Sequence, residues 1–244
     1  SVRDLVKARL VKDTVFSLDG TALHTTDHYP GAGQVKSSRE VRDKWGRGQA
    51  VVSSRHGYLL LCLRGVESGT VVAASVGKIS SSEHPHTLAL VRQAKAAGCR
   101  VRVLVIDGAY CVGDLLWQLK HQEKVDFIVP ADSSMCVTED ARSLAALHGE
   151  DFPVEDDGES RAVGVKGLTT YDAYRPPRGQ RRRGPKPTLN AVVVTRWKKE
   201  DVPLKEQKVL LTSLPVDNPL HVVELYGKRA EMENKLHREL KQGW

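Results

Sequence analysis

Two short, mostly apolar segments each end in an aspartate that is followed by glycine. Residues 15–18 (VFSL) lead into Asp19, and residues 103–106 (VLVI) lead into Asp107. A short apolar run that closes at a turn signal is typical of a strand buried inside a sheet. If the two strands lie side by side, both carboxylates meet at one edge of that sheet. The segments therefore predict a buried sheet with an acidic edge.

The Asp-Gly-Thr sequence that begins at Asp19 has three possible interpretations. Haloacid-dehalogenase-like phosphatases also have it after an apolar strand, but they need a nucleophilic aspartate two residues earlier, because a carboxylate must attack phosphorus. That position is Ser17, which disfavours a phosphatase. An ordinary turn aspartate remains open, since Asp-Gly favours turns. A metal ligand is the third reading, because hard divalent ions prefer oxygen donors.

The expected elements follow one another in an informative order. Residues 56–65 and 69–77 predict a hairpin, because both are apolar runs bounded by glycines. The remaining expected elements are helices over 84–98 and 112–121, strands over 103–106, 125–130 and 208–215, and a long final helix from Asn218 and Pro219. Residues 21–48 are too irregular to assign. Three antiparallel strands followed by alternating strands and helices are the order of a ribonuclease H-like fold, an α/β mixed sheet flanked by helices.

The segment 131–203 differs in composition from its surroundings. It is rich in turn residues, acids and basic residues, and its apolar runs predict strands at 160–168 and 189–197. We expect a β-rich insertion subdomain there, before the last core helix. The predicted organisation is a first part of the core over 1–130, the insertion over 131–203, and the last strand and final helix of the core over 204–244.

The charge distribution favours a polyanionic partner. The formal net charge is +7, and the strip at 175–187 (RPPRGQRRRGPKP) has no acid. A basic protein with a basic strip is typical of nucleic-acid binding. A solvated loop without a partner is the alternative, because Pro/Gly/Arg-rich runs are also typical of disordered segments.

Several classes of protein are disfavoured by the sequence. No run approaches the ~18 apolar residues of a membrane span, and the charged first twenty residues do not form a signal peptide. The four cysteines have no C-x-x-C spacing, which argues against structural zinc and suits a reducing cytosol.

The last helix supplies a further acid. Its expected stripe contains Tyr226, Arg229 and Glu233 at steps of three and four, among apolar residues. An acid in such a stripe is unfavourable unless it is paired or metal-bound. Pairing with Arg229 is the structural explanation, and metal binding is the functional one.

Together, Asp19, Asp107 and the spacing Tyr226-x2-Arg229-x3-Glu233 resemble the DDE transposases of bacterial insertion sequences. The closest resemblance is to the IS-four-like group with its Tyr-Arg-Glu-Lys signature, and it covers nearly the whole chain. In that family the fold is ribonuclease H-like, and a β-rich insertion separates the second aspartate from the glutamate. The signature lysine would fall at Leu240; Lys241 lies one position later, about 100° around a helix.

The resemblance implies a transposase catalytic domain that cleaves DNA at transposon ends and transfers the strands. Asp19, Asp107 and Glu233 would be the catalytic carboxylates and would bind Mg²⁺, for which Mn²⁺ can substitute. The residues expected to contact DNA are Tyr226, Arg229, Lys241, Arg181, Arg182, Arg183 and Trp197. The alternatives are a metal-dependent, structure-specific nuclease on the same fold and a DNA-binding transposase remnant that no longer cuts.

The implied partners are double-stranded DNA, at both the transposon ends and the target, and a second copy of the chain in a homodimer on DNA. No membrane is expected, and the implied location is the prokaryotic cytoplasm, associated with the nucleoid. The chain starts at Ser1 without Met and contains no recognisable helix-turn-helix. We therefore expect it to be part of a longer protein whose DNA-reading domain precedes Ser1.

Overall fold

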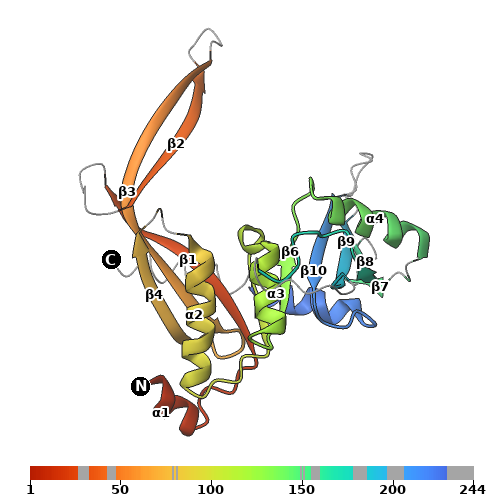
Figure 1. Ribbon diagram of the computed structural model, residues 1–244, viewed down its shortest axis with the longest axis horizontal. Coiled ribbons are helices and arrows are strands. Elements are labelled where there is room, and N and C mark those ends of the chain that lie inside the picture. Colours follow the sequence, from red (N-terminus) through yellow and green to blue (C-terminus); the bar gives the residue numbers. More distant parts are fainter. Residues whose placement is uncertain are drawn as a thin grey trace.

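The computed structural model describes residues 1–26, 33–42, 48–78, 80, 82–148, 150, 152–154, 160–177, 186–196 and 206–229. These form a mixed α/β structure in which one large sheet is flanked by helices (Figure 1). The helical elements are α1 (Val2–Lys7), α2 (Glu83–Ala96), the short 3₁₀ helix η1 (Gly108–Tyr110), α3 (Gly113–His121), α4 (Cys136–His148) and a last helix over 219–229.

Ten strands of the described residues belong to a single sheet. In chain order they are β1 (Val15–Thr26), β2 (Gly33–Arg42), β3 (Gly48–Gly65), β4 (Val71–Lys78), β5 (Val103–Val105), β6 (Asp126–Pro130), β7 (Phe152–Pro153), β8 (Ser160–Leu168), β9 (Leu189–Arg196) and β10 (Glu206–Thr212). Their order across the sheet is β2-β3-β1-β5-β6-β10-β9-β8-β7, and β4 also pairs with β3.

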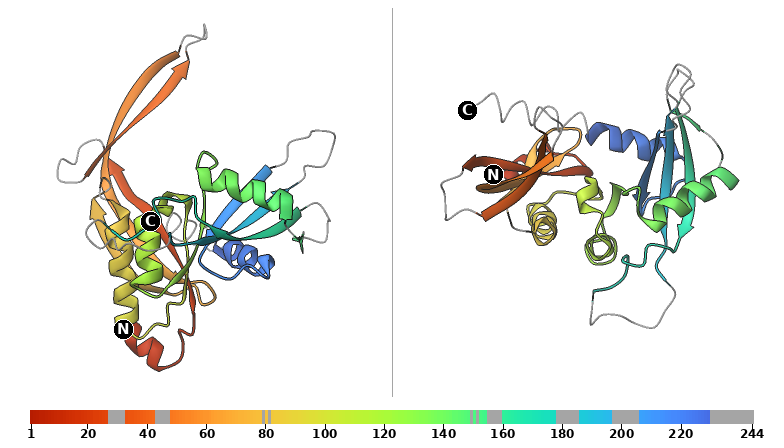
Figure 2. Two further views of the ribbon diagram at one scale, coloured as in Figure 1. Left: turned by 45° about the vertical axis from the view of Figure 1, so that its right-hand side comes forward. Right: turned by 90° about the horizontal axis from the view of Figure 1, so that it is seen from above.

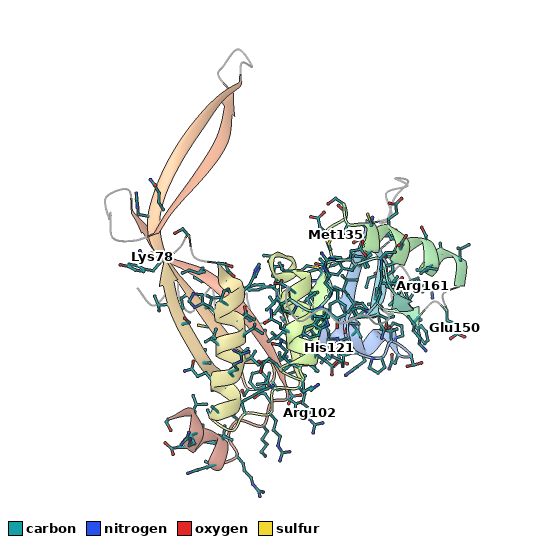
Figure 3. The ribbon with its side chains drawn as sticks, viewed as in Figure 1. Lys78, Arg102, His121, Met135, Glu150 and Arg161 are labelled. Atoms are coloured by element: carbon teal, nitrogen blue, oxygen red, sulfur yellow. The ribbon has the colours of Figure 1, made fainter. Side chains whose placement is uncertain are left out.

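The centre of this sheet has mixed strand directions. β3 is antiparallel to both β1 and β4, whereas β1, β5 and β6 are mutually parallel. β4, β1, β5 and β6 therefore run the same way, and their carboxyl ends lie toward one edge. Lys78, at the end of β4, and Arg102, just before β5, lie at opposite ends of this part of the molecule (Figure 3).

Side chains from both faces of the central strands are buried. Phe16, Leu18, Leu104 and Ile106 belong to a cluster shared with α2 and α3. Val105 belongs to a second cluster, which includes Val222 and Leu225 of the helix over 219–229. The helices lie on opposite faces of the sheet (Figure 2), which explains why residues 103–106 have no polar position: alternate side chains of a strand point to opposite faces.

Most expected elements of the core are confirmed. The hairpin is β3–β4, and the expected strands at 103–106 and 125–130 are β5 and β6. α2 ends as expected near Gly98, whose φ of +97° lies in the left-handed region that glycine adopts most readily. The strands at 160–168 and 189–197 are β8 and β9, and the final helix begins at Pro219.

The prediction that the first strand ends at Asp19, and the alternative that Asp19 is a turn residue, were wrong, because Asp19 lies within β1 and pairs with Cys62 of β3. β1 continues to Thr26, and the unassigned residues 21–48 include its second half, all of β2 and the start of β3. β2 and the first half of β3 form a two-stranded ribbon that projects from the sheet (Figure 1). Within the described strands β2 pairs only with β3. A ribbon without a sheet or helix beneath it does not require the apolar alternation by which strands are recognised.

The segment 131–203 contains a helix that composition did not reveal. α4 precedes β7, β8 and β9, and these three strands continue the large sheet beyond β10. The fully buried side chains of α4 are Val137, Thr138 and Ala141. Val137, Ala141 and Ala145 follow one another at steps of four, so the helix has an apolar face that the composition of the segment obscured. None of the helices in the described ranges has the length and apolar character that crossing a bilayer would require.

Candidate functional site

Asp19 and Asp107 lie at the same level on neighbouring parallel strands. The last pair in the register of β1 and β5 is Ser17 with Val105, and each aspartate follows that pair by two residues. The backbone of Asp107 is still extended, with φ −76° and ψ 163°. The two strands are therefore adjacent. Asp19 lies within β1, level with Asp107, which follows the end of β5. We call this level, where β5 ends beside β1, the acidic edge.

Strand alternation puts both aspartates on the same face. Positions 15, 17 and 19 of β1 alternate with the core residues Phe16 and Leu18, as 103, 105 and 107 alternate with Leu104 and Ile106. Val105 packs in the cluster with the helix over 219–229. Asp19 and Asp107 therefore belong to the face that this last helix covers.

Asp107 is the accessible member of the pair. Its side chain is 56% exposed. Oδ1 accepts a hydrogen bond from the backbone N–H of Gly108 at 2.7 Å, so that Asp107 caps the 3₁₀ helix η1. The cap orients the carboxylate with respect to the end of β5 and leaves it open to solvent.

Arg229 brings the last helix to this edge. It is only 5% exposed, and its Nη2 lies 3.9 Å from Oδ1 of Asp107. Nη1 donates a hydrogen bond of 3.3 Å to the hydroxyl of Tyr226, and the guanidinium carbon lies 5.7 Å from the centre of that ring. Lys208 Nζ lies 4.2 Å from the same ring centre. Arg229 thus lies between the exposed Asp107 and the ring of Tyr226, which Lys208 also contacts.

Two residues near the acidic pair were not singled out from the sequence. Tyr110, which is 3% exposed, donates its hydroxyl hydrogen to Oε2 of Glu83 at the start of α2. Burial raises the pKa of the Tyr110 phenol, and the hydrogen bond and charge of Glu83 and the charges of Asp19 and Asp107 raise it further. Three carboxylates therefore act on one buried hydroxyl. Neither residue has a motif that could have identified it.

The donors at this edge suit a hard divalent cation. Asp19 and Asp107 supply carboxylate oxygens, which Mg²⁺ and Mn²⁺ prefer. Across the described part of the chain, no three His, Cys, Asp or Glu side chains gather closely enough to hold an ion together. Glu233, the expected third carboxylate, lies outside that part. The described residues thus fit two ligands of such a site.

Other expected DNA contacts also lie outside the described residues. These are Arg181, Arg182 and Arg183 of the basic strip, Trp197, and Lys241. Their roles stay predictions.

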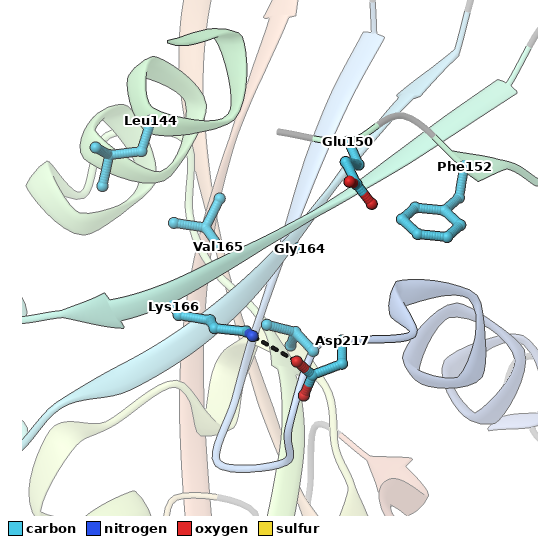
Figure 4. Close-up of a pocket in the computed structure, with 8 residues that line it drawn as sticks. Leu144, Glu150, Phe152, Gly164, Val165, Lys166 and Asp217 are labelled. Atoms are coloured by element: carbon cyan, nitrogen blue, oxygen red, sulfur yellow. Dashed lines mark hydrogen bonds and ion pairs between the residues drawn. The ribbon is translucent and has the colours of Figure 1, made fainter. Parts of the chain in front are cut away.

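The cavity in Figure 4 lies away from the acidic edge. It has a volume of about 470 Å³ and is bounded by β8 and by residues before the last helix, with a 2.5 Å ion pair between Lys166 and Asp217 at its rim. Of the predicted site residues that the structure describes, none lines it. We therefore assign the candidate site to the edge and not to this cavity.

An acidic pair at the edge of a mixed sheet, next to a buried arginine, is suited to metal-assisted chemistry on phosphates. The model of the transposase DDE domain family matches residues 11–244. The chain belongs to this family of transposases. The finer assignment to the IS-four-like group stays a prediction.

A solved structure, the piggyBac transposase synaptic complex with hairpin DNA determined by cryo-EM, is similar with a TM-score of 0.47 and 10% sequence identity. The similarity covers 95% of this chain and 41% of that one, so this chain spans less than half of the length of that relative. No curated protein sequence gives a match.

Proposed function

We propose that this chain is the catalytic domain of a DNA transposase, which cleaves DNA at transposon ends and joins the freed 3′ ends to a target. The sheet order supports a ribonuclease H-like core: an antiparallel β4-β3-β1 unit continues into parallel β5 and β6. The single observation that carries the proposal is the placement of Asp19 and Asp107 at one level of adjacent strands in a chain of the transposase DDE family.

The catalytic centre in this proposal consists of Asp19, Asp107 and Glu233. Glu233 follows Arg229 by four residues, and residues four apart share a helix face. A helix that continues beyond 229 would therefore carry Glu233 on the side from which Arg229 approaches Asp107. Bound Mg²⁺ or Mn²⁺ would supply activation of the attacking hydroxyl and stabilisation of the leaving oxygen.

The basic residues have a separate role in the proposal. Arg229, oriented by Tyr226 and lying beside Asp107, can neutralise a DNA phosphate that approaches the acidic edge. Lys241, the basic strip with Arg181, Arg182 and Arg183, and Trp197 would contact DNA further out. Two copies would pair two DNA ends, in the prokaryotic cytoplasm.

The test begins with metal binding by the whole chain. Mn²⁺ is titrated and followed by electron paramagnetic resonance, with Asp19→Asn, Asp107→Asn and Glu233→Gln as variants. Asp114→Asn is the matched control, because Asp114 is an exposed acid in the first turn of α3. We expect each site variant to weaken Mn²⁺ binding at least about tenfold, because a carboxylate ligand is lost, while the control is unchanged.

The second stage separates the possible activities. A DNA end with a free 3′-hydroxyl and a labelled target duplex are incubated with the chain and Mn²⁺. Joined products that disappear in Asp107→Asn support a transposase. Cleavage without joining would indicate the nuclease, and DNA binding with neither activity would indicate a remnant. Mn²⁺ binding that is the same in all variants would contradict the proposed metal site.

A further inference from the structure

Three elements meet beside the acidic edge. Glu83 is the first residue of α2, Tyr110 is the last residue of η1, and Gly20 follows Asp19 in β1. Gly20 lies on the α2 side of β1, because the preceding even-numbered residues, Phe16 and Leu18, pack in the cluster that includes α2. Glu83 thus approaches β1 from the face opposite to the one that Asp19 occupies.

The bond between Tyr110 and Glu83 is the tie between these elements. The tyrosine is 3% exposed, so its hydroxyl has little access to water, and Glu83 Oε2 accepts a hydrogen bond from it. A buried hydroxyl needs such a partner, and a carboxylate acceptor makes the hydrogen bond stronger than a neutral one. The tie fixes η1 against the start of α2.

The carboxylate of Glu83 is also confined by β1. A Cβ atom placed on Gly20 would lie 3.0 Å from Oε2 and 3.3 Å from both Cδ and Oε1 of Glu83. The carboxylate therefore packs directly against the backbone next to Asp19, and an added Cβ at Gly20 would require it to move by a few tenths of an ångström. One side chain contacts both the residue after Asp19 and the turn after Asp107.

The turn η1 transmits this contact to Asp107. The backbone N–H of Tyr110 donates to the carbonyl of Asp107 at 2.9 Å, and the carboxylate of Asp107 caps the N–H of Gly108 at 2.7 Å. The short helix η1 therefore connects Tyr110 to the side chain of Asp107 through two hydrogen bonds. A shift of the ring would rotate the carboxylate.

From this arrangement we propose that Glu83 and Tyr110 are positioning residues that hold Asp19 and Asp107 in the geometry that binds a divalent cation. The inference rests on the proposed cation site. It differs from the simple role of an acid in the first turn of a helix, which favours the helix dipole without affecting a neighbouring site. Partners that orient metal ligands typically contribute about 10- to 100-fold to metal affinity.

The experiment is a Mn²⁺ titration of the full chain, followed by electron paramagnetic resonance, with a thermal unfolding curve for each variant. Tyr110→Phe and Glu83→Ala break the tie, whereas Glu83→Gln keeps an acceptor for the tyrosine. Gly20→Ala displaces the carboxylate by adding a methyl group. Glu139→Ala is the matched control, an acid in the first turn of α4.

We expect Tyr110→Phe and Glu83→Ala to weaken Mn²⁺ binding about tenfold or more, and Glu83→Gln to stay within about twofold of the wild type. Gly20→Ala should weaken binding in the same direction, and Glu139→Ala should not change it. If Glu83→Gln binds Mn²⁺ as weakly as Glu83→Ala while Tyr110→Phe binds it like the wild type, the charge of Glu83 is important and its hydrogen bond to Tyr110 is not. That result overturns the inference. Changes in melting temperature with unchanged affinity overturn it too.

Asp19→Asn and Asp107→Asn, measured alongside, separate two kinds of failure. If they weaken Mn²⁺ binding and the tie variants do not, only the positioning role is wrong. If neither aspartate variant changes binding, the proposed site itself is wrong, and the inference is overturned with it.

Discussion

Arg229 Nη2 lies 3.9 Å from Oδ1 of Asp107, although the two residues belong to a helix and a strand end that are far apart in sequence. The arginine is 5% exposed, whereas the aspartate side chain is 56% exposed. The buried guanidinium thus presents its positive charge to the accessible side of the acidic edge. This relationship links the Tyr226-x2-Arg229 motif to the second aspartate.

Replacing Arg229 should affect both stability and DNA binding. In Arg229→Ala, the bond to the Tyr226 hydroxyl and the charge beside Asp107 are both lost. We expect the free energy of unfolding to fall by about 1–3 kcal/mol, which urea denaturation measures, and affinity for duplex DNA to fall in a fluorescence anisotropy titration. Lys228→Ala is the control, since Lys228 forms a surface pair with Glu224 and should change stability by about 0.5 kcal/mol or less. Equal effects of both variants would contradict a specific role for Arg229.

The start of α3 requires glycine at position 113. A Cβ atom there would lie 2.1 Å from the carbonyl carbon of Ala173 and 2.5 Å from the nitrogen of Tyr174. Because these are backbone atoms, Gly113→Ala should lower the free energy of unfolding by about 1–3 kcal/mol in urea denaturation. Gly227→Ala, in the last helix with no atom of the described residues within 4 Å of its added Cβ, should instead stabilise the chain by about 0.5–1 kcal/mol. A Gly113→Ala protein as stable as the wild type would show that the contact is not tight.

Asp13 has a structural role that differs from that of the acidic edge. It is 4% exposed, and its Oδ1 accepts hydrogen bonds from the backbone N–H groups of Glu67 at 2.7 Å and Ser68 at 3.0 Å. Asp13→Ala should lower the free energy of unfolding by about 1–3 kcal/mol, because both N–H groups lose their acceptor. Asp4→Ala, with its exposed side chain at the N-terminus, is the control and should have a small effect. Mn²⁺ affinity should be unchanged in both; a loss of Mn²⁺ binding in Asp13→Ala would assign it to the metal site.

The four cysteines should react with a thiol reagent in a defined order. Burial raises the pKa of Cys111 to about 11 and also raises the pKa values of Cys62 and Cys99, whereas Cys136 is exposed. Since the thiolate is the reactive form and a raised pKa reduces it at pH 8, Ellman's reagent should label Cys136 first in the native protein. Labelling of Cys111 should increase only as the pH rises toward 11. Loss of the fast phase in Cys136→Ser checks the assignment, and an unchanged fast phase would contradict it.

Local pattern was sufficient for much of the core. Glycine-bounded apolar runs predicted β3 and β4, and uninterrupted apolar residues predicted β5 as a strand buried on both faces. These elements can be recognised from the sequence because one or both of their faces are buried and therefore consist of apolar side chains. The sequence left open whether the strands of Asp19 and Asp107 are neighbours, and the parallel register of β1 and β5 shows that they are.

Two elements were missed, the ribbon of β2 with the first half of β3 and the helix α4. The ribbon of β2 and the first half of β3 is held by backbone pairing outside the main sheet, and α4 buries only small or polar side chains fully. Backbone hydrogen bonds leave no pattern in the side chains. The ribbon could therefore not be inferred from its side chains, whereas the helical spacing of Val137, Ala141 and Ala145 in α4 was overlooked among acids and turn residues.

The sequence by itself determined the presence of the buried strands and of the helix that carries Tyr226 and Arg229, but not where the first strand ends. Only the tertiary structure decided that Arg229 faces Asp107 and that Glu83 meets Tyr110 beside Gly20. The physical reason is that burial has a local signature along one strand or helix. A contact between two side chains depends on how three or more elements pack, which no single segment of sequence records.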